Sequence, residues 1–228
     1  LGIVSVRSAW LWMGLAWVVA GVWASMDTQR IVVYGMGMCL GVLYNHKRWS
    51  WKDRPYVGLL ANIVGHGSLT FVAGWMAAGG GSLAGAWASV PYGLAVGCTF
   101  ILTTVVDHEG DRASGKNTLA VASGIRSAKR WASGCCSCAA IGGAVLGDVW
   151  MALAACVTLA LMGWDVYYTK VGAGAIAKVS VGVLALTVAL RWPPLLVMAG
   201  VTFVAARVYY SRRFQKRYPV LLDAGQKA

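Results

Sequence analysis

The sequence predicts an all-α fold, a polytopic bundle of transmembrane helices. Hydrophobic residues make up 58% of the 228 residues, charged residues only 12%, and the mean hydropathy is +0.63. These values lie far from those of a soluble globular domain. A helix needs about 20 apolar residues to cross the hydrocarbon core, so a chain of this length can hold about eight spans joined by short loops. We therefore expect one domain over residues 1–228, ending in a basic cytoplasmic tail at residues 209–228.

Apolar runs divide the chain into candidate membrane segments. The last two are separated by the prolines Pro193 and Pro194, because paired prolines interrupt a helix. Polar stretches at Asn45–Tyr56, Asp107–Arg130 and Lys170–Lys178 are expected to lie between segments, outside the hydrocarbon. The predicted segments are Val4–Ala24, Ile31–Tyr44, Val57–Ala78, Ala84–Val106, Trp131–Leu146, Val149–Tyr168, Val179–Leu190 and Pro194–Tyr209.

Basic residues are distributed unevenly between the loops. If successive segments alternate in direction, all of the 20 lysines and arginines except Arg30 and Arg191 fall at one end of the bundle. Cytoplasmic loops of membrane proteins carry such an excess of positive charge. The end that holds Asn45–Tyr56 and Asp107–Arg130 is therefore expected to face the cytoplasm. The net charge of +12 then reflects contacts with anionic membrane lipids, and we expect no nucleic-acid partner.

The densest group of acids directly follows the apolar segment that ends at Val106. Asp107 and Asp111 are four residues apart, which on a helix places their side chains about 40° apart on one face. Carboxylates so placed can share Mg²⁺, which typically takes one or two of them together with phosphate oxygens. Arg112 and Lys116 add positive charge for a phosphate. We predict a catalytic metal site at Asp107 and Asp111; a solvated loop of mutually neutralising charges is the alternative.

Another polar pair lies inside the segment Val57–Ala78. Asn62 and His66 are four residues apart and share a helical face, and polar side chains within a bilayer usually face the bundle interior. They are candidates for binding an acceptor or lining a cavity, with interhelical hydrogen bonding as the alternative. Near the end of its segment, Asp165 is expected either to reach the cavity mouth or to pair with Lys170.

The run D-H-E-G-D-R-A-S-G-K-N-T-L-A-V over Asp107–Val121 resembles the second aspartate-rich motif of the UbiA superfamily of intramembrane prenyltransferases. The extended form G-D-x-x-x-G-K-x-T-L-A-V makes this resemblance specific. Tyr44–Lys52, followed by Asp53-Arg54-Pro55, is similar to another loop of that family, in which a tyrosine begins the loop and a lysine reaches the diphosphate. The tail Val208–Pro219 also resembles bacterial members, so the resemblance spans essentially the whole chain.

The resemblance implies transfer of a prenyl chain from a prenyl diphosphate to an aromatic or other lipophilic acceptor within the membrane. Mg²⁺ would be the cofactor, held by Asp107 and Asp111. The acceptor would occupy a cavity for which Asn62 and His66 are candidates. The diphosphate would be contacted by residues of the two cytoplasmic loops: Lys52, Lys116, Arg112 and Tyr44.

One feature of the family has no counterpart here, its first aspartate-rich motif, N-D-x-x-D-x-x-x-D. Ile3–Trp10 resembles the segment that follows this motif, so we expect the chain to lack the amino-terminal helices that carry it. This chain would then hold half of the metal site. A natural variant that has lost the motif, and with it activity, is the alternative.

Two other functions are considered. A CDP-alcohol phosphatidyltransferase-like enzyme also uses spaced aspartates, but its upstream D-G-x-x-A-R element is missing and the G-K-x-T-L-A-V continuation argues against it. A transporter or other non-catalytic membrane protein would be expected to show an internal repeat and helices broken at the midplane. The sequence shows no such repeat, and its acids cluster beside a membrane segment instead of within one.

Overall fold

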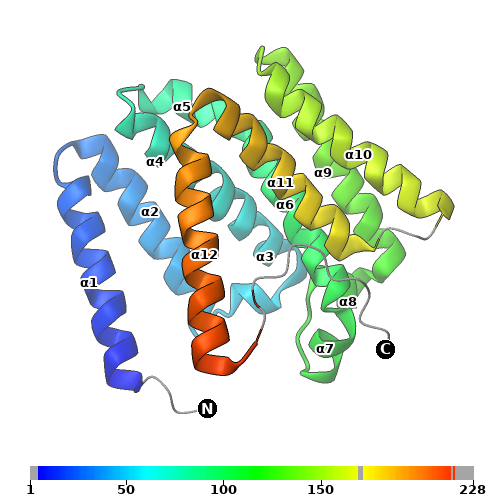
Figure 1. Ribbon diagram of the computed structural model, residues 1–228, viewed down its shortest axis with the longest axis horizontal. Helices are drawn as coiled ribbons and strands as arrows, with labels where there is room; N and C mark the ends of the chain where they lie inside the picture. Colours follow the sequence, from blue (N-terminus) through cyan, green and yellow to red (C-terminus); the bar gives the residue numbers. More distant parts are fainter. Residues whose placement is uncertain (1–4, 169–171, 217, 219–228) are drawn as a thin grey trace.

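The computed structural model describes residues 5–168, 172–216 and 218. These residues form helices joined by short turns, with no strand in the described part of the chain, and the long helices run as antiparallel neighbours (Figure 1). The predicted all-α membrane bundle is confirmed. Five described helical stretches are long and apolar enough to cross a membrane: Val6–Ala24, Pro55–Ala77, Leu83–Val106, Ala173–Leu190 and Pro194–Phe214.

The first antiparallel pair consists of α1 (Val6–Ala24) and α2 (Thr28–Asn45). Asp27 begins α2 by accepting a hydrogen bond from a backbone N–H of its first turn, as a favourable N-cap residue does. The hydroxyl of Tyr34 donates to the carbonyl of Trp17 at 2.8 Å and joins the two helices. Most side chains of α1 remain exposed on the bundle, which suits a helix that faces lipid.

The third predicted segment is one continuous helix with an irregular centre. A π-helical stretch, η2 (Asn62–Leu69), lies between α3 (Pro55–Ala61) and α4 (Thr70–Ala77). At its end, the hydroxyl of Thr70 donates to the carbonyl of Gly65, five residues earlier, which matches the wider π turn. Such stretches frequently occur at functional sites, and this one contains both polar residues predicted for the segment.

The fourth segment consists of α5 (Ser82–Ala88) and α6 (Val90–Val106), which meet at Ser89. The α6 helix is the centre of the bundle, because it packs against η2, α9 and α11. Two of its residues, Ile101 and Leu102, have no exposed surface. The position of Asp107, directly after α6, is therefore set by the best-packed helix of the protein.

Close packing of η2 on α6 depends on glycine. A Cβ atom added to Gly67 would lie 2.4 Å from the Cα of Gly93, and one added to Gly97 would lie 2.7 Å from the side chain of Ile63. Gly93 and Gly97 form a G-x-x-x-G pattern, which lets two helix backbones approach in a membrane. The sequence therefore brings the irregular η2 stretch directly against the central helix.

The remaining long helices are α9 (Ile125–Val145), α10 (Val149–Tyr168), α11 (Ala173–Arg191) and α12 (Pro194–Phe214). Small residues allow α9 to pack on α6 and α10, since Ala128, Ala132 and Ala139 have no exposed surface. In contrast, no described residue of α12 is buried. The core therefore lies mainly among α6, α9, α10 and α11, and it includes no residue of α12, which lies between α2 and α11 in the view of Figure 1.

Two helix starts differ from the prediction by six residues, more than the others. The helix α9 begins at Ile125 instead of Trp131, because Gly124 adopts φ +81° and a new helix starts directly after it. Likewise, α11 begins at Ala173, so Lys178 lies inside a helix and not in a connector, since the alanine-rich sequence there favours helix. The basic residues after Gly124 are thus helical, which the sequence pattern did not indicate.

The structure also differs from the prediction near the carboxyl end of the chain. The helix α12 continues to Phe214, beyond the expected end at Tyr209, because no helix breaker follows Tyr209 and the αL residue Gln215 ends the helix. The start of the first predicted segment at Val4, the residue Lys170 and most of the predicted tail lie outside the described residues.

Candidate functional site

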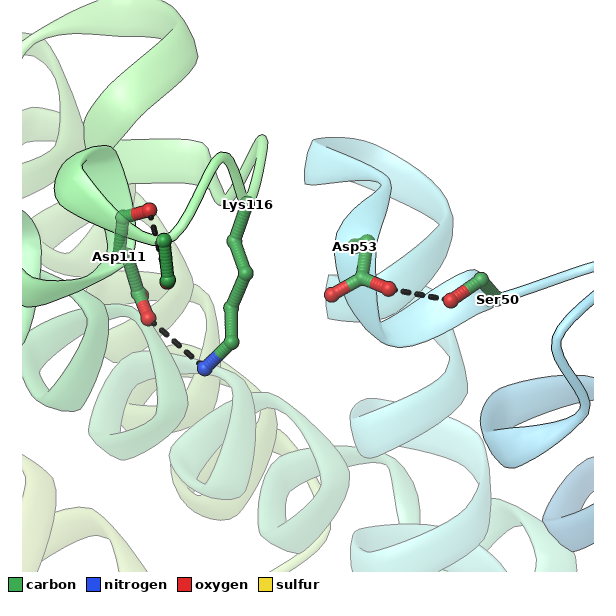
Figure 2. A network of polar contacts seen from close by, with 5 residues as sticks. Ser50, Asp53, Asp111 and Lys116 are labelled. Atoms are coloured by element: carbon green, nitrogen blue, oxygen red, sulfur yellow. Dashed lines mark hydrogen bonds and ion pairs between the residues drawn. The ribbon is translucent and has the colours of Figure 1, made fainter.

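The candidate site lies at the end of the bundle where α1 begins and α12 ends (Figure 1). The loop from α2 to α3 contains η1 (Trp51–Asp53), and the loop from α6 to α9 contains α7 (His108–Ala113) and α8 (Leu119–Ser123). Contacts between α3 and α8 bring the two loops together. Figure 2 shows Asp53 on one side of this junction, and Asp111 and Lys116 on the other.

Asp107 lies directly after the apolar helix that ends at Val106, as expected, and separates it from a second, short helix. The helix α6 ends at Val106, and the backbone of Asp107 (φ −87°, ψ 4°) separates it from α7, which begins at His108. The chain turns here because the apolar sequence that keeps α6 in the bundle ends at Val106. A backbone hydrogen bond of 2.8 Å from Asp111 N–H to the Asp107 carbonyl retains the one-turn spacing. Asp111 is nevertheless only 8% exposed, whereas Asp107 is exposed.

Asp111 is the centre of the polar contacts in the second loop. Its carboxylate Oδ1 accepts a hydrogen bond from Lys116 Nζ at 3.1 Å, and the two form an ion pair. Its backbone carbonyl accepts from the N–H of Lys116 at 3.0 Å and from the hydroxyl of Ser114 at 3.1 Å. The loop is therefore closed around this one residue.

Three carboxylates raise the pKa of Lys116. Its pKa is raised above the ordinary value, first by the hydrogen bond from its ammonium group to Asp111 and then by the charge of Asp111. The charges of Asp53 and Asp107 raise it further. The side chain is 50% exposed, so the ammonium group remains at the open side of the junction.

Two polar residues at the junction were not among the predicted site residues. Asp53 accepts a hydrogen bond from the hydroxyl of Ser50. Thr118 precedes α8, is 8% exposed, and its hydroxyl has no hydrogen-bond partner among the described residues. A buried hydroxyl without a partner is unfavourable, so Thr118 is a candidate to bind a ligand oxygen. Both residues belong to the stretches that resemble the UbiA superfamily, which was the signal available in the sequence.

Tyr44, Asn62 and His66 share one cavity. This cavity, of about 250 Å³, lies between α2 and the α3–η2 segment. Asn62 is 7% exposed, and its side-chain amide donates to the Gly58 carbonyl at 2.8 Å and to the Tyr44 hydroxyl at 3.4 Å. His66 is exposed. The structure therefore brings Tyr44 to the two residues predicted for the acceptor.

The remaining predicted contacts to a diphosphate are on the surface of the two loops. Lys52 lies in η1 and Arg112 in α7, and both are exposed. Neither forms an ion pair with any residue that the structure describes. Both side chains are thus available to an anion that approaches the junction.

The chemistry of the site suits a hard divalent cation. No group of three or more His, Cys, Asp or Glu side chains that could bind a metal occurs within the described chain. Mg²⁺ differs from most metals in using only one or two carboxylates together with substrate phosphates. Asp107 and Asp111 could supply those carboxylates, because Lys116 occupies only one carboxylate oxygen of Asp111. The unpartnered Thr118 hydroxyl next to this loop also fits a site that a ligand completes.

Fold and site together define a multi-pass integral membrane protein with charged loops gathered at one mouth of a helical bundle. The chain belongs to the UbiA prenyltransferase family, whose sequence profile matches residues 1–174. The match includes both loops of the site and leaves α12 outside. The predicted resemblance is thereby confirmed over residues 1–174, whereas the resemblance predicted for the tail Val208–Pro219 lies outside the match. Membership places the chain among the intramembrane prenyltransferases. Searches of the curated proteins and of the solved structures gave no match.

Proposed function

We propose that this protein transfers a prenyl group from a prenyl diphosphate to an aromatic or other lipophilic acceptor, with Mg²⁺ held by Asp107 and Asp111 at the cytoplasmic mouth. The observation that carries the proposal is the junction of the two loops. There the ammonium group of Lys116 lies at the open side of a group of carboxylates that includes Asp111 and Asp53. A diphosphate with a divalent cation carries the charges that such a junction complements.

The residues of the two loops bind and orient the diphosphate. Lys52 and Arg112 are exposed and without an ion pair in the described chain, so they are available to phosphate oxygens. The ammonium group of Lys116 shares its hydrogen bonds between Asp111 and the diphosphate. The hydroxyl of Thr118 donates to an oxygen of the diphosphate. Mg²⁺, when bound, neutralises the charge that develops on the leaving diphosphate.

Cleavage occurs at the allylic C–O bond, and its electron pair leaves with the diphosphate. The acceptor then donates an electron pair to the allylic carbocation, and the new bond is completed when the acceptor loses a proton. Positive side chains of the loops stabilise the leaving group, which is the preorganised electrostatic effect that usually dominates such catalysis. The apolar bundle keeps water away from the carbocation.

The acceptor would bind in the cavity between α2 and the α3–η2 segment. Tyr44, Asn62 and His66 line this cavity, and the glycines on its walls leave room for a ring. Asn62 already donates one hydrogen bond to the Gly58 carbonyl, so its contact with Tyr44 is the one that an acceptor oxygen would replace. The adjacent α2–α3 loop leads from this cavity to Lys52.

The metal site is tested by replacing each aspartate separately. The full-length protein, which supplies the first aspartate-rich motif expected before this chain, is reconstituted in liposomes with Mg²⁺, farnesyl diphosphate labelled in its chain, and a membrane lipid extract as the source of acceptor. Diphosphate release and transfer of label to a lipid product are measured. Asp107→Ala and Asp111→Ala are each expected to lower turnover by about 100-fold or more, the usual loss when a stabiliser of developing charge is removed.

Glu109→Ala is the matched control, because Glu109 is an exposed acid between the two aspartates, in the same short helix as Asp111, and has no proposed role. It should keep turnover close to that of the unmodified protein. Unchanged turnover in both aspartate variants would refute the metal site. An equal loss in all three variants would instead indicate that the acids act together as general surface charge.

A further inference from the structure

A second polar cluster contains none of the residues assigned to the loop junction and has no role in the proposed transfer. Arg126, Lys129, Arg130 and Ser133 follow the i, i+3, i+4, i+7 spacing of one helical face. They share that face because α9 starts at Ile125, as the structure shows, so residues expected in a loop form an ordered row. The row lines a cavity.

The cavity has a volume of about 350 Å³ and lies among α6, α9, α10 and α11. Its inner wall is apolar, formed by Leu102, Met162 and Ile176, which are 0%, 6% and 1% exposed. Its other wall carries the row from α9 and the carboxylate of Asp165 from α10. One side of the cavity is thus charged and the other is suited to hydrocarbon.

One of the three cations is already neutralised. Lys129 Nζ donates to Asp165 Oδ2 at 2.5 Å, and Asp165 is only 7% exposed. Asp165 was expected to reach the cavity mouth or to pair with Lys170; Lys170 lies outside the described residues, and the partner that the structure gives is Lys129. The pair is reasonable because a buried carboxylate is costly unless a cation accompanies it.

The two arginines keep their charge available. Arg126 and Arg130 are exposed, and neither has a hydrogen bond or ion pair from its side chain to another residue of the described ranges. The hydroxyl of Ser133 is directed to the Lys129 carbonyl at 3.1 Å, so it does not supply a donor to the cavity. Recognition of a ligand therefore rests on the two guanidinium groups, which bind phosphate oxygens in a bidentate manner.

We propose that this cavity binds an anionic phospholipid of the surrounding membrane. Its phosphate lies between Arg126 and Arg130, and the first part of an acyl chain lies along Leu102, Met162 and Ile176. The cavity opens at the basic end of the bundle, where the cytoplasmic leaflet supplies anionic headgroups. A soluble phosphate would leave the apolar wall exposed to water, whereas a phospholipid covers both walls.

The test measures lipid retained by the full chain in nanodiscs. Nanodiscs are made from equal parts of phosphatidylglycerol and phosphatidylcholine, and native mass spectrometry counts the lipid that remains bound after release. The unmodified protein is expected to retain phosphatidylglycerol in preference to phosphatidylcholine. Each arginine near the headgroups contributes about a fivefold preference, so the double variant R126Q/R130Q should lose roughly 25-fold in selectivity.

The control is R212Q/R213Q, which removes the same charge from exposed arginines at the same end of the bundle, on α12. It should keep the preference for phosphatidylglycerol. Equal retention of both lipids by the unmodified protein, or equal selectivity in both double variants, would overturn the proposal. Displacement of phosphatidylglycerol by farnesyl diphosphate, lost in R126Q/R130Q, would also overturn it and assign the cavity to the path of the prenyl substrate.

Because Arg126 and Arg130 are exposed, glutamine at these positions should leave the fold intact. Far-ultraviolet circular dichroism of each variant in detergent, without added lipid, checks this point. The result does not depend on the proposed transfer reaction, since lipid retention is measured without substrate.

Discussion

Replacing Gly67 with alanine should force η2 away from α6. A Cβ atom at residue 67 would lie 2.4 Å from the Cα of Gly93, whereas ordinary van der Waals contacts of a Cβ begin at 3.4 Å. The shortfall is therefore about 1 Å, and overpacking of this kind must be relieved by movement of the backbone. No rotation of a side chain can relieve it, because the three atoms nearest to the new Cβ are backbone atoms of Gly93.

The expected cost follows from the same geometry. Added methyl groups in a well-packed core typically cost 1–3 kcal/mol, and a clash between two backbones lies at the upper end, about 2–3 kcal/mol. Gly74→Ala is the matched control, because Gly74 lies in the same continuous helix and has no atom within 4 Å of an added Cβ. It removes a glycine from a helix interior and should stabilise the protein by up to about 1 kcal/mol.

The free energy of unfolding is measured by titrating detergent-solubilised protein with sodium dodecyl sulfate and following helix content and tryptophan fluorescence. Gly67→Ala should unfold at a lower fraction of dodecyl sulfate than the unmodified protein, and Gly74→Ala at the same or a higher fraction. If the two variants unfolded together, the close contact between η2 and α6 would be refuted. The position of Asp107, which directly follows α6, would then need another explanation.

Two further predictions concern the loop junction. Thr118→Val removes a hydroxyl that is buried without a partner in the described chain, so the free energy of unfolding should rise by about 1 kcal/mol. At the same time, kcat/KM for the prenyl diphosphate should fall, because the hydroxyl no longer contacts the ligand. A fall in both the free energy of unfolding and kcat/KM would show that the hydroxyl is needed only for folding. The pKa of Lys116 is raised above 10.5, first by its hydrogen bond to Asp111, so its ion pair should contribute fully to stability below pH 10.5 and lose this contribution as the pH rises through the higher folded-state pKa. The stability difference between the unmodified protein and Lys116→Met should therefore be constant from about pH 8 to about pH 10 and narrow above that range; a difference that already narrows near neutral pH would contradict the ion pair.

Sequence reasoning found both loops of the site, because each has a pattern that does not depend on distant residues. The aspartates and cations of Asp107–Val121 are close in sequence, and so are the tyrosine and the lysines of Tyr44–Lys52. The alternation of span direction was enough to place the two loops at the same end. It was not enough to show that Asp53 faces Lys116, because that contact depends on how α3 packs against α8.

The differences between the sequence prediction and the structure have a common physical cause. Arg126 and its neighbours were expected in a loop because charge inside a span is costly, yet they form a helical row whose charge is accommodated by a cavity and by Asp165. Hydropathy measures residues one at a time and contains no information about a partner on another helix. For the same reason, the unpartnered hydroxyl of Thr118 could not be recognised before the burial of the loop was known.

The sequence by itself determined the class of fold, the approximate position of the long helices and the two charged loops. It could do so because the cost of placing polar groups in hydrocarbon acts locally, residue by residue. Only the tertiary structure decided that Gly67 meets Gly93, that Tyr44 lies beside Asn62, and that Lys129 pairs with Asp165. Each of these contacts joins two different helices, and the angle and register at which helices pack follow from the shapes of both surfaces together.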